Sequence, residues 1–488
     1  MRTLEITLLL LSAILPILSA QLLFKLPLKS RRIAIAGFIS ILLTHLVFEG
    51  YRWQMIPIYF LSFFFVITAI QNKSFFGTSR FKKIVTSLIL GFSLILGSVL
   101  SIGLPIFELP QPTGKYAVGA LHYHLKTGAP EIISPEPSDN RELMLKIWYP
   151  AALNNEPTEP YLTKAERVGF ARKYGIPDAA LNYLDCIETN TYVNPNTAKG
   201  KFPVLIFSPG IYTNATGYYA LLEELTSRGF IVVNINPTYE STGSSFPDGS
   251  MLFYNQEFDR KHNTKAMSKL AWGSTQDYLK AKTKKEEFAA VEELLRNYVA
   301  NIITLRWAKD ISLVIDHLYN LKTEIPLAQH MNLTKIGVFG HSQGGAAAGE
   351  ALIYDSRIKA GLNLDGVQWG NVLDTSFSKP FAYLSSDWPE DHPNLNEHIY
   401  QRGNSTDFYE GKILHSGHAS FMDIPLMINI PVINESGSIA PTLAHKISST
   451  FVLQFFEKYL QDEPHQILEL EDKFENLNLK MNTIKTKR

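Results

Sequence analysis

One stretch of the chain has residue types and spacing that can do chemistry, Gly340-His341-Ser342-Gln343-Gly344. This is the G-x-S-x-G pattern of a nucleophile elbow, in which a serine lies on a sharp turn between a strand and a helix. The apolar run at 335–339 is typical of a buried parallel strand, and the small residues at 346–352 are typical of a helix start. The two glycines leave room for a strained backbone and close helix–strand packing. The pattern therefore predicts that Ser342 is a catalytic nucleophile.

A serine at neutral pH needs a histidine base and a carboxylate that orients this base. The expected chain order is serine, acid, histidine. His418 lies in a loop directly after the last apolar strand, where a base is expected, and His415 is the alternative. Asp365 and Asp387 each end one of the two strands after the elbow strand, and periodicity does not decide between them. His341 precedes the nucleophile, so we expect its side chain to point away from the base and to serve packing.

The oxyanion that forms during acyl transfer needs two backbone N–H donors. One is expected at Gln343, directly after the nucleophile. The other should come from the loop after the strand at 204–208. Because Pro209 has no N–H, the second donor is either Gly210 or Ile211.

Strands alternate with helices on both sides of the elbow, which predicts a mostly parallel sheet covered by helices on both faces. This is the α/β class, here with the α/β-hydrolase fold preceded by a helical membrane region. Expected strands include 143–150, 204–208, 230–235, 335–339, 358–365, 380–385 and 411–414. The expected organisation is a membrane region at 1–107, a catalytic domain at 108–465 and a charged, flexible tail at 466–488.

The composition excludes several classes of protein. The 488 residues carry 46 basic and 46 acidic side chains and no basic stripe with interleaved aromatic residues, so no nucleic-acid partner is expected. Cys186 is the single cysteine, so no intrachain disulfide can form. The sequence has neither a Cys/His cluster nor an H-E-x-x-H motif, so neither a metal ion nor another cofactor is expected.

Four apolar runs occupy the first hundred residues, at 4–24, 33–48, 55–70 and 84–107. A helix that spans a membrane needs about 20 predominantly apolar residues. The first and fourth runs meet this length, and the other two need their flanks as interfacial anchors. The alternative is that residues 1–20 form a cleaved signal peptide.

Basic residues concentrate in the first and third loops between these runs, namely Lys25, Lys29, Arg31 and Arg32, and Lys73, Arg80, Lys82 and Lys83. The positive-inside rule places such loops in the cytoplasm. We therefore expect an integral membrane protein in contact with the lipid bilayer. With four spans, its N-terminus and its catalytic domain are extracytoplasmic.

Several short motifs from about Pro110 to Leu460 together resemble the platelet-activating factor acetylhydrolase family of α/β-hydrolases, of the plasma or lipoprotein-associated type. They are 112–119, 147–150, 207–210, 246–249, 340–345, 364–365 and 418–423. The resemblance implies that the acid is the aspartate 23 positions after the serine, Asp365. It also implies a histidine loop of the form H-x-x-F-x-D, which His418 begins. The family's usual Ser-His-Gly-Leu oxyanion loop corresponds to 208–211, which makes Ile211 the implied donor.

On this resemblance we expect a membrane-anchored serine ester hydrolase that deacylates lipids in the manner of a phospholipase A. Its implied substrate is 1-alkyl-2-acetylglycerophosphocholine or another phospholipid with a short or oxidised sn-2 chain. The same elbow leaves open a general carboxylesterase, a polyester hydrolase or an acyltransferase. A further alternative is a receptor or transport-associated membrane protein with an inactive hydrolase domain.

Overall fold

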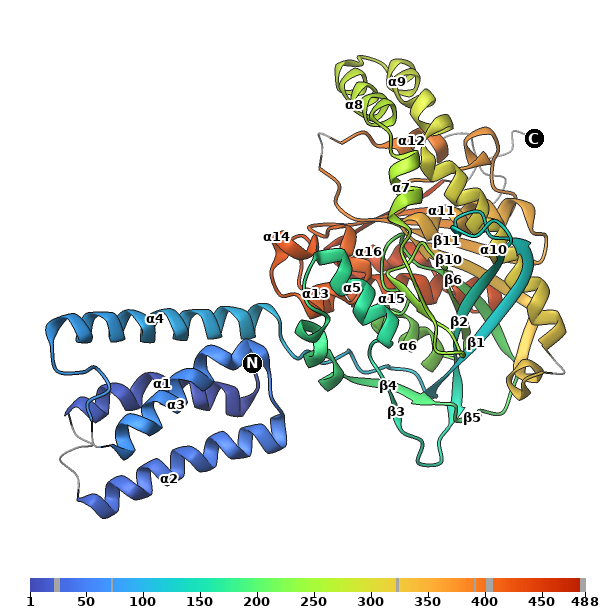
Figure 1. The fold of residues 1–488 in the computed structure, drawn as a ribbon. Helices are drawn as coiled ribbons and strands as arrows, with labels where there is room; N and C mark the ends of the chain where they lie inside the picture. Colours follow the sequence, from blue (N-terminus) through green and yellow to red (C-terminus); the bar gives the residue numbers. More distant parts are fainter. Residues whose placement is uncertain (22–26, 72, 322–323, 390–391, 401–406, 483–488) are drawn as a thin grey trace. The chain divides into compact units, whose positions relative to one another are not determined.

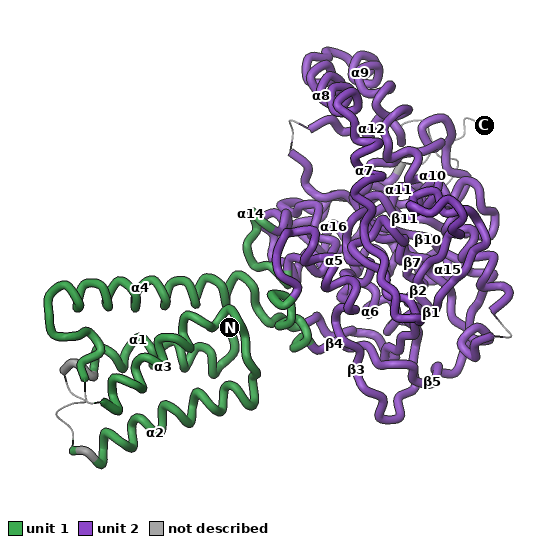
Figure 2. Tube along the Cα trace, in the orientation of Figure 1, with its two compact units in different colours: residues 1–108, 179–187, 426–433 green, residues 109–178, 188–425, 434–488 purple. Residues whose placement is uncertain are grey.

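The computed structural model describes residues 1–21, 27–71, 73–321, 324–389, 392–400 and 407–482. The chain divides into two compact units, coloured separately in Figure 2. Unit 1 contains Met1–Glu108, Ala179–Ile187 and Leu426–Ile433, and unit 2 contains Leu109–Asp178, Glu188–Pro425 and Asn434–Arg488. The segments Ala179–Ile187 and Leu426–Ile433 lie within the expected catalytic domain, 108–465, but belong to the unit that holds the N-terminal helices.

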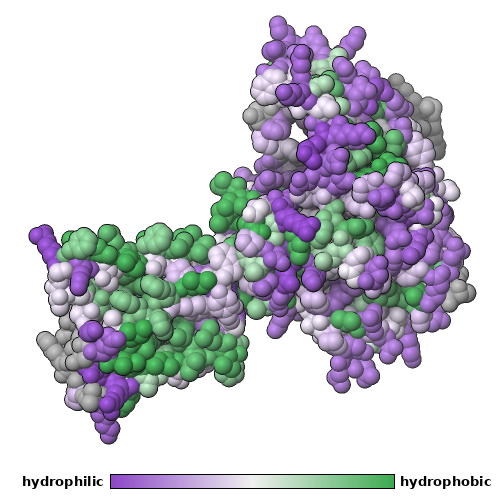
Figure 3. Space-filling model, in the orientation of Figure 1, coloured by the Kyte–Doolittle hydropathy of each residue, from purple (hydrophilic) through white to green (hydrophobic). Residues whose placement is uncertain are grey.

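Unit 1 is built from apolar helices, whose outer surface is apolar in Figure 3. The four helices are α1 (Thr3–Gln21), α2 (Leu28–Thr44), α3 (Ile56–Ile70) and α4 (Arg80–Gly103). Among the described residues, three segments are long and apolar enough to cross a membrane, Lys29–Glu49, Trp53–Ile70 and Arg80–Gly103. The first expected span corresponds to α1, whose apolar part, Thr3–Leu18, is shorter than these three segments. Residues 22–24 of that run lie outside the described residues.

A buried polar cluster closes one end of these helices. Glu5 and Arg52 form an ion pair of 2.9 Å, and both side chains are fully buried. Arg52 also donates to the carbonyl oxygen of Leu104, and Arg2 donates to that of Glu49. The N-terminus, the loop between α2 and α3 and the end of α4 therefore meet at the same end of unit 1.

Unit 2 contains a mostly parallel sheet with helices on both faces, as predicted (Figure 1). In the described part of the chain, twelve strands form this sheet, in the order β14-β13-β12-β11-β10-β6-β7-β2-β1-β4-β3 with β5 paired to β2. The parallel centre runs from β7 to β13. The strands are β1 (Ala117–Pro130), β2 (Asn140–Ala152), β3 (Thr158–Pro160), β4 (Glu188–Val193), β5 (Asn196–Thr197), β6 (Phe202–Ser208), β7 (Ile231–Asn236), β10 (Met331–His341), β11 (Ile358–Leu364), β12 (Phe381–Ser385), β13 (Phe408–Ile413) and β14 (Leu477–Asn482).

Strand β10 shows how the two faces of the sheet are covered. Val338 packs in the core that includes Trp307 of α10 and Ala347 of α11, and Phe339 faces Phe456 of α15 on the other side. The alternation follows from the twofold side-chain period of a strand. The remaining elements are α5 (Lys164–Tyr174), α6 (Tyr219–Ser227), α7 (Gln256–His262), α8 (Lys265–Lys280), α9 (Lys284–Asn297), α10 (Val299–Asn320), α11 (Gln343–Tyr354), α12 (Leu395–Tyr400), α13 (Ile424–Met427), α14 (Pro431–Asn434), α15 (Pro441–Leu460), α16 (Leu470–Lys473) and the hairpin β8 (Gly243–Ser245) and β9 (Met251–Phe253).

The expectation of a flexible tail from residue 466 is wrong for the part that the structure describes. Strand β14 pairs with β13 in an antiparallel register and forms an edge of the sheet. Apolar and polar residues alternate along it, and Leu477 is buried. This apolar face favours packing of the segment against the sheet, although its overall composition is rich in lysine. Residues 483–488 of the expected tail lie outside the described residues.

Candidate active site

Ser342 lies on the turn between β10 and α11, with φ 56° and ψ −122°. This backbone region is rare for residues other than glycine, so the surrounding packing must hold it. A Cβ atom on Gly344 would lie 2.0 Å from the carbonyl oxygen of Ser208, so the close approach of α11 to β6 requires glycine there. The Ser342 N–H donates to the carbonyl oxygen of Leu364 at 2.8 Å, which ties the elbow to the end of β11.

His418 begins a short 3-10 turn (His418–Phe421) at the same edge of the sheet, and its Nδ1 lies 2.7 Å from Oδ2 of Asp365. The Asp365 carboxylate is buried and also accepts the N–H and hydroxyl of Ser386 and the indole N–H of Trp388, at 2.7–2.8 Å. Desolvation alone would lower the pKa of His418, but the hydrogen bond and charge of Asp365 raise this pKa above its ordinary value of 6.5. These contacts hold His418 with Nδ1 toward the acid.

The two alternative residues contact each other instead. The His415 N–H donates to Oδ2 of Asp387 at 3.0 Å, and Oδ1 of Asp387 lies 3.6 Å from Nζ of Lys412. His415 is exposed, and its backbone φ is 63°. The structure therefore brings Asp365, and not Asp387, to the histidine that follows the last parallel strand.

His341 does more than the packing expected of it. Its ring lies 4.6 Å from that of His418, and its Nε2 is 3.0 Å from the His418 carbonyl oxygen. A carbonyl can only accept, so Nε2 carries the hydrogen, and Nδ1 accepts from the Tyr218 hydroxyl at 3.0 Å. Burial holds the pKa of His341 well below 6.5, which keeps the ring neutral. The expectation that the His341 side chain turns away from the base is wrong. This side chain packs against the ring of His418 and donates to its carbonyl oxygen, which stabilises the loop that carries His418.

The Tyr218 hydroxyl also distinguishes between Gly210 and Ile211, the two candidates for the second oxyanion donor. The Gly210 N–H donates to the Tyr218 oxygen at 2.9 Å, so it is already engaged. Across the described residues, the N–H groups of Ile211 and Gln343 donate to no protein acceptor. Gln343 begins α11, where the first N–H groups of a helix have no intrahelical partner. The predicted donors Ile211 and Gln343 therefore keep their N–H groups free of other protein partners, whereas Gly210 does not.

A protein family described as platelet-activating factor acetylhydrolase, isoform II, matches residues 104–477. The chain belongs to this family. The match includes the elbow and leaves out the first 103 residues, which hold the four helices α1–α4.

Relatives of this acetylhydrolase family member are distant in sequence. Platelet-activating factor acetylhydrolase of Cavia porcellus is 21% identical, over 72% of this chain and 78% of that protein. A probable 1-alkyl-2-acetylglycerophosphocholine esterase of Arthroderma benhamiae is 22% identical, and the match covers 53% of this chain and 59% of that protein. The acetylhydrolase of Gallus gallus is 23% identical, and the match spans 62% of its length. The family makes this chain an ester hydrolase, as expected.

A solved structure has the same fold as unit 2. The ferulic acid esterase from Streptomyces cinnamoneus aligns with a TM-score of 0.57 at 24% sequence identity. The alignment covers 75% of this chain and 96% of the esterase. This likeness supports the α/β-hydrolase fold that the alternation of strands and helices predicted.

The H-x-x-F-x-D pattern of the histidine loop ends in an aspartate, Asp423. Asp423 is buried and accepts the N–H groups of Tyr219 and Ala220 at 2.6 and 3.2 Å, so it caps the start of α6. Burial raises the pKa of Asp423 to about 7, against the opposing effect of these two donors. Its own N–H donates to the carbonyl oxygen of Gly217. Asp423 thus fastens the loop of His418 to the helix that follows Tyr218.

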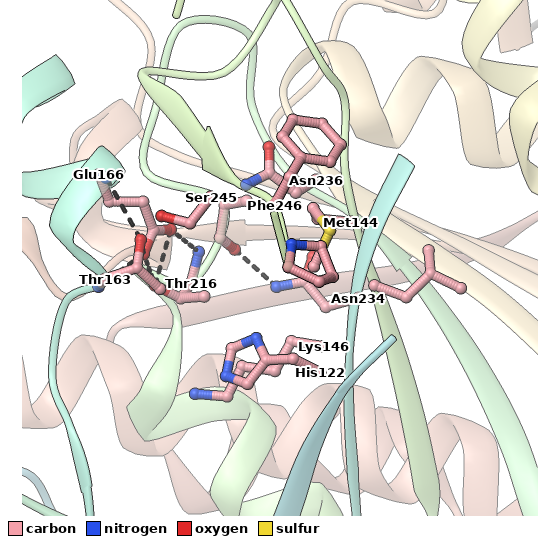
Figure 4. Close-up of a pocket in the computed structure, with 13 residues that line it drawn as sticks. His122, Met144, Lys146, Thr163, Glu166, Thr216, Asn234, Asn236, Ser245 and Phe246 are labelled. Carbon is pink, nitrogen blue, oxygen red and sulfur yellow. Dashed lines mark hydrogen bonds between the residues drawn. The ribbon is translucent and has the colours of Figure 1, made fainter. Parts of the chain in front are cut away.

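A separate cavity of about 270 Å³ lies over β2 and β7 (Figure 4). Ser342, Asp365 and His418 do not line it. Lys146 forms a buried ion pair with Glu159, which also accepts from His122. Burial would raise the pKa of Glu159, but Lys146 and His122 outweigh burial and lower this pKa to about 2. Lys146 at this cavity is thus paired with Glu159, and Glu166, which also lines it, accepts from Thr163 and Thr216. Among the described residues, no group of three or more His, Cys, Asp or Glu side chains is placed to hold a metal ion.

Proposed function

We propose that this protein is a membrane-anchored serine hydrolase that deacylates glycerophospholipids of the 1-alkyl-2-acetylglycerophosphocholine type. One observation carries the proposal: the 2.7 Å contact from His418 to buried Asp365, beside the strained elbow of Ser342. The names of the relatives from Cavia porcellus and Arthroderma benhamiae support the substrate class.

In the proposed reaction, Ser342 Oγ attacks the acyl carbonyl carbon while Nε2 of His418 takes the serine proton. Asp365 holds the ring and balances the imidazolium charge, and the N–H groups of Ile211 and Gln343 receive the oxyanion. When the tetrahedral intermediate collapses, His418 returns the proton to the departing glycerol oxygen and the lysophospholipid leaves. Water then attacks the acyl-serine with His418 as base, which releases the carboxylic acid and restores Ser342.

The test of this proposal is covalent labelling of the serine. A fluorophosphonate reacts with an activated serine, so we expect one label per chain, mapped by mass spectrometry to Ser342. The Ser342→Ala variant should neither take the label nor release acetate from 1-alkyl-2-acetylglycerophosphocholine. If this variant keeps full esterase activity, the assignment of the nucleophile is wrong.

The membrane anchor is part of the same proposal, with the hydrolase unit on the extracytoplasmic side. Its support is the polar cluster of unit 1, which gathers the N-terminus, the loop between α2 and α3 and Leu104 at one end of the helices. When the N-terminus and the end of α4 lie at the same end of the helices, the chain crosses the membrane an even number of times between them. The exposed basic residues before and within the first turn of α4, at 73–83, then belong to the cytoplasmic end.

A matched pair of lysine-to-cysteine variants tests this orientation. Lys115 follows the last apolar helix, Lys73 lies in the loop between α3 and α4, and both are exposed. In a Cys186→Ser background, we expect a membrane-impermeant maleimide on intact cells to label Lys115→Cys and not Lys73→Cys. Permeabilised cells should give labelling of both variants. Labelling of Lys73→Cys alone in intact cells would reverse the orientation.

A further inference from the structure

A small cavity lies directly against the two proposed oxyanion donors. It measures about 160 Å³, and Ile211 and Gln343 are among the residues that line it. The first turns of α10 form another part of its wall, with Val299, Ala300 and Ile303. An acyl group on Ser342 whose carbonyl oxygen points to these two N–H groups has this cavity beside its chain.

The wall of this cavity suits an apolar chain. Ile303 and Val299 are buried aliphatic residues, and Phe258 of α7 adds an aromatic ring. The one buried carboxylate in the wall, Glu240, is paired with Arg141 and Arg306. The other carboxylate in the wall, Asp259, is partly exposed and accepts a hydrogen bond from the side-chain amide of Asn263, so one side of the cavity is polar.

The size of the cavity limits what it can hold alone. A water molecule takes up roughly 30 Å³ in the liquid, so 160 Å³ holds about five water-sized groups. An acetyl group fits with room to spare. A longer acyl chain must continue into another space.

Such a space borders the cavity. Asn263 and Tyr298 line the cavity and also line a groove of about 400 Å³ along α8, so these two residues separate the two spaces. Asn263 is exposed and its amide donates to Asp259, and Tyr298 is partly exposed. The groove follows Met267, Ala271 and Thr275, which recur every fourth residue on one face of the helix. Trp272 completes its wall with an indole that is 69% exposed.

We propose that this groove on α8 binds the distal part of a medium-length acyl chain that passes between Asn263 and Tyr298. The ester hydrolase then accepts straight acyl chains of about ten carbons as well as acetyl. A chain laid along the helix loses water from its methylenes, which favours binding. The inference rests on the proposed function, because it takes Ser342, Ile211 and Gln343 as the reacting centre.

The experiment compares two alanine-to-tryptophan variants of the full-length protein in detergent. Ala271→Trp fills the groove, whereas Ala266→Trp adds the same ring at an exposed described residue of α8 outside the groove. The substrates are p-nitrophenyl acetate and p-nitrophenyl decanoate. We expect Ala271→Trp to lower kcat/KM for the decanoate at least about tenfold, equal to about 1.4 kcal/mol, with the acetate unchanged. Ala266→Trp should match wild type for both, and both variants should keep the wild-type melting temperature.

The outcomes separate this inference from the proposed function. If Ser342→Ala hydrolyses p-nitrophenyl acetate as wild type does, the proposed function fails. If acetate hydrolysis depends on Ser342 but Ala271→Trp keeps the wild-type ratio of decanoate to acetate, the groove inference alone fails. It also fails if wild type does not turn over the decanoate, or if Ala266→Trp loses decanoate activity to the same extent.

Discussion

His418→Ala is expected to lower kcat by about 10⁶-fold, the order of loss measured when the histidine of another serine hydrolase triad is removed. Without an imidazole beside Ser342, no group takes the serine proton as the acyl carbonyl is attacked. The methyl group of alanine leaves Asp365 its hydrogen bonds to Ser386 and Trp388, so the loop that holds the acid keeps its partners. Turnover of p-nitrophenyl acetate and the rate of fluorophosphonate labelling measure the loss.

The matched control is His415→Asn, three positions earlier in the same segment. The His415 side chain is exposed, and asparagine tolerates its left-handed backbone, which has φ 63°. Its backbone N–H can still donate to Asp387. We expect kcat within about twofold of wild type, since surface substitutions away from special contacts have small effects. A large loss in His415→Asn with an active His418→Ala would exchange the roles of the two histidines.

The elbow and the sheet could be predicted because their signals are local. A β-branched run, two glycines at fixed spacing and a small-residue helix start all lie within twenty residues of Ser342. The mostly parallel arrangement of the sheet then follows from the alternation of strands and helices. The prediction of a flexible tail is wrong at β14 because it was based on the lysine-rich composition. The short alternation of apolar residues in this segment stabilises a strand only when it pairs with β13.

The choice of acid could not be made from the residues alone, since Asp365 and Asp387 both end strands at the same edge of the sheet. The structure separates them through contacts from a different loop, where Ser386 and Trp388 turn their donors toward Asp365. The role of His341 was missed for a similar reason. Its partner Tyr218 lies 123 residues away in sequence, and no local pattern connects the two.

Asp365→Asn is the sharpest test of that choice, with an expected fall in kcat of about 10⁴-fold. Asparagine has nearly the same shape, but its amide nitrogen cannot accept the Nδ1 hydrogen of His418. The ring then holds the wrong tautomer, and its Nε2 no longer presents a lone pair to Ser342.

The pH dependence of the same variant gives a second readout. Asp365 raises the pKa of His418 above 6.5, so wild-type kcat/KM should fall as the pH drops through that raised pKa and the base becomes protonated. In Asp365→Asn the charge is gone and desolvation remains, so the acid limb of the residual activity should move to lower pH. Rates measured between about pH 5 and 8 cover the range in which a histidine titrates. Asp387→Asn, whose carboxylate contacts the His415 backbone and Lys412, should keep both the rate and the acid limb of wild type. A shifted limb in Asp387→Asn and an unshifted one in Asp365→Asn would make Asp387 the partner of the catalytic base.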